Sequence, residues 1–166
     1  MKTYKDILEK KDTEILVGKA LDQIVQDSFH KYFKDSFASS GTTAMNNDNY
    51  SIFTFHYGKD TKEFPNGIRQ NDALSLQFAV DIDPETGYIV EFQQNRITVK
   101  PKDKYMAFSG HKLKVRKFRS KTTADLLKKL DKLFAMVNTV TKDLLKKGEL
   151  DIHSAEVVKM IKKRTK

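Results

Sequence analysis

Residues 74–92 read LSLQFAVDIDPETGYIVEF and carry the clearest structural signal in the chain. Apolar side chains alternate with polar or small ones as far as Ile82, and the alternation resumes at Tyr88. A period of two is typical of a strand with one buried face. The intervening DPETG contains a proline suited to begin a turn and a glycine that can adopt a positive φ. This stretch therefore predicts an antiparallel β-hairpin.

Three further strands are predicted around the hairpin, at residues 50–57, 96–100 and 112–116, because β-branched and aromatic residues recur there between turn-forming residues. In the last of them, alternation turns Leu113 and Val115 inward. The polar segment 39–49 has no period and predicts a loop. We expect an antiparallel sheet of about five strands with helices covering one face.

The helices are predicted from spacings of three and four between apolar residues. One long helix is expected between Asp12, its N-cap, and Ala38. A second is expected to begin at Thr122 or Thr123 and to end before Gly148, and a third, short helix carries Val157, Val158 and Ile161.

An apolar stripe runs along the second of these helices. It comprises Leu126, Leu130, Leu133, Val137, Val140 and Leu144. The stripe is too short for the three to four heptads that favour a coiled coil, so it predicts core, with a helical dimer seam as the alternative. The expected fold class is α+β: an antiparallel sheet with one N-terminal and two C-terminal helices on one face, in one domain over residues 1–166.

Composition excludes several classes of site. The chain of 166 residues has no cysteine, so thiolate zinc sites, disulfides and cysteine nucleophiles are excluded. No stretch approaches the roughly 18 consecutive apolar residues of a membrane span, and the first residues lack a secretory apolar region. We expect a soluble protein in a reducing compartment, the cytoplasm, with no membrane partner.

Charge is distributed unevenly along the chain. Residues 1–99 contain 11 Lys and Arg against 15 Asp and Glu, a net charge of −4, whereas residues 100–166 contain 20 against 7, a net charge of +13. Such an asymmetry indicates a polyanionic partner for the C-terminal part. Nucleic acid, DNA before RNA, is the leading candidate, and an acidic protein surface is the alternative.

The candidate contact residues mix cations with aromatic side chains. They are Lys100, Lys102, Lys104, Lys112, Lys114, Arg116, Lys117, Arg119 and Lys121, with Tyr105, Phe108, His111 and Phe118 among them. Cations neutralise phosphates and aromatic rings can stack on unpaired bases, so the mixture favours backbone contact without sequence specificity. For the aromatic residues, packing in the core is the competing interpretation.

Catalytic chemistry has weaker support. Asp81, Asp83 and Glu91 lie close together on the predicted hairpin, and with His56 they could serve a metal-dependent nuclease. Gln93 occupies the position where an acid-x-lysine motif needs lysine, and the DPETG run is a common turn. His30, His56, His111 and His153 lack the spacing of a helical zinc pair. We therefore expect no catalytic residues, no metal and no cofactor.

Two enzyme classes also lack their signature motifs. The chain has neither a glycine-rich phosphate loop nor a Gly-x-Ser-x-Gly motif. Phe53, Phe55 and Tyr57 share one strand parity, which suggests an RNA-reading platform or a buried strand. Burial statistics favour the buried strand.

The opening MKTYKDILE, residues 1–9, resembles the N-terminal propeptide of internal head proteins of large tailed phages. In that family the propeptide ends at an Ile-x-Glu or Leu-x-Glu cleavage site, which Ile7-Leu8-Glu9 would fit, although Lys10 replaces the usual small residue. The resemblance implies a basic protein packaged with DNA, trimmed after Glu9 and delivered with the genome, in the virion interior and then the host cytoplasm. It also implies, as an alternative, an inhibitor of a host defence protein.

Overall fold

The computed structural model describes residues 14–34, 39–57, 74–99, 109–115 and 117–149. Their elements, in chain order, are α2 (Gly18–Tyr32), β1 (Ser39–Ala44), β2 (Tyr50–Tyr57), β3 (Leu74–Asp83), β4 (Gly87–Val99), β5 (Ser109–Lys112), β6 (Phe118–Ser120) and α3 (Thr123–Lys146).

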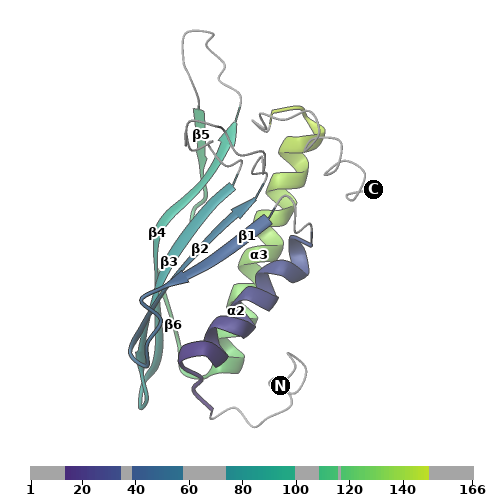
Figure 1. The fold of residues 1–166 in the computed structure, drawn as a ribbon. Helices are drawn as coiled ribbons and strands as arrows, with labels where there is room; N and C mark the ends of the chain where they lie inside the picture. Colours follow the sequence, from purple (N-terminus) through teal and green to yellow (C-terminus); the bar gives the residue numbers. More distant parts are fainter. Residues whose placement is uncertain (1–13, 35–38, 58–73, 100–108, 116, 150–166) are drawn as a thin grey trace.

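The strands form one antiparallel sheet in the order β1-β2-β3-β4-β5. The short β6 pairs with residues 88–90 of β4, whereas β5 pairs with residues 96–99 of the same strand. Helices α2 and α3 lie together on one side of the sheet (Figure 1). The predicted α+β class and the one-sided packing are confirmed.

The helix count differs from the prediction. One helix, α3, follows the sheet within the described part of the chain, where two were expected. The other, predicted around Val157, Val158 and Ile161, lies outside the described residues.

The β4 strand is continuous, although the sequence predicted two strands there. Gln77 pairs with Gln94 and Phe78 pairs with Phe92, which leaves Gln93 as an extra residue on β4. One extra residue in one strand of an antiparallel pair is a β-bulge, and it shifts the side-chain parity by one. The interrupted alternation that suggested two strands is therefore a bulge within one strand.

The β1 strand occupies residues that were predicted to be a loop. Its inward positions carry small or polar residues, because α2 presents polar groups to it: Thr43 Oγ1 donates a hydrogen bond to the Asp22 carboxylate and accepts one from Gln26 Nε2 at 3.2 Å. A Cβ at Gly41 would lie 2.8 Å from the Phe55 ring. The strand packs through hydrogen bonds and close backbone approach, so no apolar alternation marks it.

The last predicted strand is shifted along the chain. β5 ends at Lys112, three residues after it begins, and the next carbonyl, that of Leu113, accepts a hydrogen bond from Asn95 Nδ2 at 2.7 Å. Leu113 is buried and Lys114 is exposed, as the alternation predicted, whereas Arg116 lies outside the described residues. The chain then resumes pairing at β6, which was not predicted.

Helix α2 is shorter than expected. It begins at Gly18 and ends at Tyr32, so Asp12, which lies outside the described residues, does not cap it. The N-cap residue is Val17, whose side chain makes no capping hydrogen bond. Phe33, the residue after the helix, is buried, and residues 35–38 of the predicted helix lie outside the described residues.

Both ends of α3 agree with the prediction. Thr122 Oγ1 accepts a hydrogen bond from the Asp125 amide at 3.2 Å, which is the capping contact expected of a threonine N-cap. At the other end Gly148 has φ +69°, and its amide donates to the Leu145 carbonyl at 3.1 Å. The Glu149 amide donates to the Leu144 carbonyl at 2.9 Å, which completes a Schellman motif.

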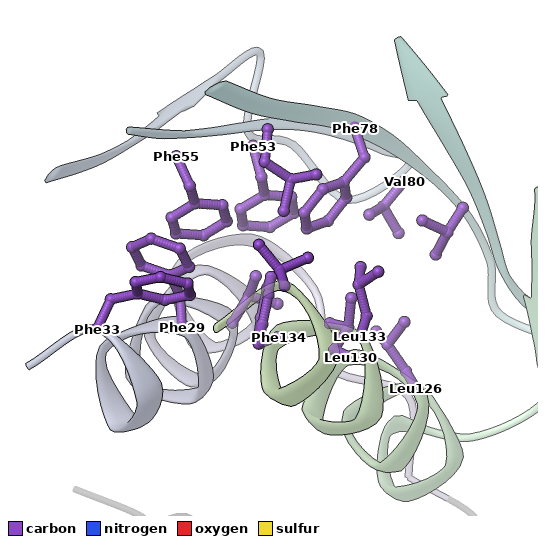
Figure 2. Close-up of a cluster of buried hydrophobic side chains, with 14 of the residues drawn as sticks. Phe29, Phe33, Phe53, Phe55, Phe78, Val80, Leu126, Leu130, Leu133 and Phe134 are labelled. Atoms are coloured by element: carbon purple, nitrogen blue, oxygen red, sulfur yellow. The ribbon is translucent and has the colours of Figure 1, made fainter. Parts of the chain in front are cut away.

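An aromatic cluster fills the space between the sheet and the two helices (Figure 2). The Phe29 ring of α2 stacks on the Phe55 ring of β2 with centroids 4.3 Å apart. The Phe134 ring of α3 meets the edge of both, at 5.5 and 5.6 Å. Phe53 stacks on Phe78 at 5.3 Å, and none of these five side chains is exposed. The core assignment of Phe53, Phe55 and Tyr57 is confirmed.

The α3 stripe packs into this same core. Leu126, Leu130, Leu133 and Val137 are buried, and Val140 and Leu144 are partly buried against the cluster. The stripe thus serves the core of its own chain, as predicted.

A second buried cluster, which we call the Tyr88–Thr123 latch, consists of these two side chains and the backbone of residues 14–16. Tyr88 Oη donates to the Leu16 carbonyl at 2.6 Å, and Thr123 Oγ1 donates to the Glu14 carbonyl at 2.8 Å. Thr123 Oγ1 also accepts from the Leu16 amide at 2.9 Å. These hydrogen bonds connect residues 14–16, before α2, to Thr123 at the start of α3 and to Tyr88 of the β3–β4 hairpin.

Gly87 closes the β3–β4 turn with φ +94°, and a Cβ there would clash with the Ser120 carbonyl and lie 2.7 Å from Lys121 Cα. We expect Gly87→Ala to lower the free energy of unfolding by more than the ~1–2 kcal/mol of a left-handed backbone, because β6 must also move. Gly148→Ala is the matched control, since Gly148 has φ +69° but nothing within 4 Å of a Cβ. Urea unfolding of both variants measures the difference, and equal losses would contradict the prediction.

Candidate nucleic-acid interface

Seven of the thirteen predicted contact residues lie in the described part of the chain. Four of them are exposed cations around β6: Lys114, Lys117, Arg119 and Lys121. His111 and Lys112 belong to β5, where the backbone register pairs them with Ile97 and Arg96. The remaining predicted residues, Lys100, Lys102, Lys104, Tyr105, Phe108 and Arg116, lie outside the described residues.

Lys117 and Arg119 border the face of the sheet that the helices leave uncovered. Lys117 Nζ lies 3.6 Å from Glu91 Oε2, and both side chains are more than half exposed. Exposed ion pairs of this kind contribute little to stability, so Lys117 can exchange Glu91 for another anion. Arg119 pairs with Ile89 across the ladder and shares its face of the sheet.

Phe118, by contrast, packs against the core. Its ring centroid lies 6.3 Å from that of Phe92, and Lys129 Nζ lies 5.8 Å above the ring on the other side. The same Lys129 ammonium donates to the Arg119 carbonyl and pairs with Asp125 Oδ2 at 2.9 Å. Phe118 therefore packs in the structure and does not present its ring for base stacking. Lys129 connects β6 to α3 through these contacts.

Sequence reasoning omitted four lysines from the list of contact residues, all on the outward side of α3. They are Lys128, Lys132, Lys142 and Lys146. A signal for them was available, because residues opposite the Leu126 and Leu130 stripe of a helix must point away from the core.

Asp83 and Glu91, two of the three candidate carboxylates on the hairpin, have partners of their own. Asp83 Oδ1 accepts hydrogen bonds from the Glu85 and Thr86 amides at 2.8 and 3.1 Å, and these bonds lower the pKa of Asp83. Glu91 is paired with Lys117, as described above. Within the described ranges no group of three His, Asp or Glu side chains is placed to hold a metal ion. The turn interpretation of DPETG accounts for Asp83 without a metal.

The histidines occupy separate surroundings. His56 lies on the uncovered face of the sheet, opposite Ser75, and the His30 ring meets the Phe29 edge with centroids 5.4 Å apart. His153 lies outside the described residues.

No helix in the described ranges is long and apolar enough to cross a membrane. Comparison with protein-family models, curated proteins and solved structures finds no match to this chain. What the fold and the site define is an α+β domain whose exposed cations gather around β6 and on the outward side of α3.

Proposed function

We propose that this protein is a non-enzymatic nucleic-acid-binding protein that contacts the phosphate backbone through its C-terminal Lys and Arg side chains. One observation carries the proposal: exposed cations around β6 and along α3 have no carboxylate within ion-pair distance among the described residues. They are Lys114, Arg119, Lys121, Lys128, Lys132 and Lys146. Cations left without local partners are available to replace the counterions of a polyanion.

Contact with the phosphate backbone also agrees with the residue types. Bidentate recognition of bases in the major groove uses mainly Arg, Asn and Gln, whereas this surface is built mostly from lysine, which binds phosphate as a point charge. We therefore propose that the protein binds DNA without sequence specificity. We also propose that it does so in the cytoplasm, which would be that of a host cell if the protein is phage-encoded.

Salt dependence tests this proposal. If about four phosphates are contacted, the affinity for a DNA oligonucleotide should fall roughly 10²-fold between 50 and 200 mM salt, because the slope is about −0.9 per contact. Fluorescence anisotropy at a series of salt concentrations measures it. An affinity independent of salt, or no binding at low salt, would contradict the proposal.

An acidic protein surface is the alternative partner, since it would use the same cations. Capture of partners from a nuclease-treated lysate separates the two possibilities. Retention of a specific acidic protein, together with failure to bind oligonucleotides, would favour an interaction or inhibitor protein of the kind that the resemblance of residues 1–9 implies.

A further inference from the structure

The surface of α3 divides into a buried side, two flanks and an outward side. The buried side carries Leu126, Leu130, Phe134, Val137 and Thr141. At about 100° per residue, the side opposite to these carries four lysines and two small residues. They are Lys128, Lys132, Ala135, Thr139, Lys142 and Lys146. Asp125 and Asp143 also fall on this side, about 40° from its centre, so the outward side carries four lysines against two carboxylates.

Each of the three carboxylates of α3 has a partner among the described residues. Asp125 pairs with Lys129 at 2.9 Å, and Asp143 pairs with Lys147 at 2.9 Å. Asp131, on one flank, accepts from Ser28 Oγ at 2.8 Å and lies 3.5 Å from Lys31 Nζ. Lys129 and Lys147 thus balance the two outward aspartates, and the four outward lysines make no ion pair with a described carboxylate.

The outward lysines form two pairs separated by a neutral gap. Lys128 and Lys132 are one helical turn apart, as are Lys142 and Lys146, and three of the four are exposed while Lys142 is partly exposed. Lys132 of the first pair and Lys142 of the second are ten residues apart in sequence, which places them about 15 Å apart along the helix axis. That separation is comparable to the ~12 Å width of the B-DNA major groove.

The gap between the pairs offers no means of reading bases. Ala135 has no polar side-chain atom, and Thr139 Oγ1 donates its proton to the Ala135 carbonyl at 3.0 Å. No aromatic residue lies on the outward side of α3, because Phe134, the one aromatic residue in the helix, is buried. Stacking, which dominates single-strand binding, is therefore unavailable on this surface.

From these observations we infer that α3 lies across a groove of duplex DNA, with Lys128 and Lys132 on the phosphates of one strand and Lys142 and Lys146 on those of the other. This inference rests on the proposed function and adds to it the form of the nucleic acid and the contacting surface. Between the pairs, Ala135, Thr139 and the exposed Met136 at the edge of the outward side present no charged or aromatic group to the groove, so they do not specify its sequence.

The test compares three double variants by anisotropy across a salt series. They are Lys128→Gln with Lys132→Gln, Lys142→Gln with Lys146→Gln, and, as a matched control outside α3, Lys19→Gln with Lys34→Gln, two exposed lysines without a described ion pair. Each α3 variant should lower the salt slope for a duplex by about 2, since each lost phosphate contact removes about 1. The control should leave the slope unchanged, and wild type should bind a duplex more tightly than either of its separated strands.

The outcomes distinguish the role of α3 from the proposed nucleic-acid binding itself. If wild type binds no nucleic acid, both are wrong. If it binds and both α3 variants keep the wild-type slope, the α3 inference alone is overturned and the contacts belong to the residues around β6. A loss confined to one lysine pair, or equal affinity for single strands and duplex, also overturns it. Circular dichroism of each variant verifies that α3 is intact, and glutamine retains good helix propensity.

Discussion

Replacing Phe55 with alanine is expected to lower the free energy of unfolding by about 3–5 kcal/mol, the usual cost of truncating a buried phenylalanine. Phe55 is fully buried and joins three elements, because its ring stacks on Phe29 of α2 at 4.3 Å and meets Phe134 of α3 at 5.6 Å. The missing ring would leave a void between the sheet and both helices, where neighbouring rings cannot close it without moving a helix.

Urea or thermal unfolding measures this loss, and Met136→Ala is the control. Met136 is a large apolar residue of α3 but is 43% exposed, so its truncation should change the unfolding free energy by no more than about 0.5 kcal/mol. A Phe55→Ala loss as small as that of the control would show that the aromatic cluster does not support the fold as described.

Alkaline pH is expected to destabilise the fold through the Tyr88–Thr123 latch. Burial raises the pKa of Tyr88 to about 12 from an ordinary value near 10. Between pH 10 and 12 the Tyr88 hydroxyl loses its proton in the unfolded chain but retains it in the folded chain. The contribution of the protonated Tyr88 to the free energy of unfolding is therefore complete below pH 10. It is lost as the pH rises to 12, by about 1.4 kcal/mol per pH unit.

The variant Tyr88→Phe isolates this contribution. It should be less stable than wild type at pH 8, by about 1–3 kcal/mol, because the Leu16 carbonyl loses its hydroxyl donor in a buried site. Between pH 10 and 11, however, its stability should fall less than that of wild type, by roughly 1 kcal/mol. Lysine deprotonation affects both proteins alike, so the difference between them is the measurement. Parallel curves over this range would contradict the role given to Tyr88.

Alternation and capping signals predicted most of the fold, and β1 shows where they failed. The β3–β4 hairpin and both ends of α3 follow from local signals, namely period-two alternation, a threonine N-cap and a glycine after the last turn. β1 was predicted to be a loop because its partner surface is polar: Asp22 and Gln26 of α2 bind Thr43, and no single-sequence pattern reveals a distant polar partner.

The candidate site was predictable in its charge but not in its arrangement. Counting charges along the sequence located the cations in the C-terminal part of the chain. It could not show that Glu91 pairs with Lys117, or that Phe118 packs under Lys129, since both contacts depend on β6 joining β4. Nor could it show that Asp125 and Asp143 of α3 pair with Lys129 and Lys147, which leaves the four outward lysines without a described ion pair.

The Tyr88–Thr123 latch also constrains the order in which the chain can fold during synthesis. The Thr123 hydroxyl and the Glu14 carbonyl that it binds are separated by 109 residues, so the latch cannot be completed until the start of α3 has left the ribosome. Contacts of such sequence separation close late, because the entropy of a long loop must be lost before any contact compensates for it. Helix α2, whose aromatic face needs both Phe55 and Phe134, therefore emerges first and docks among the last elements.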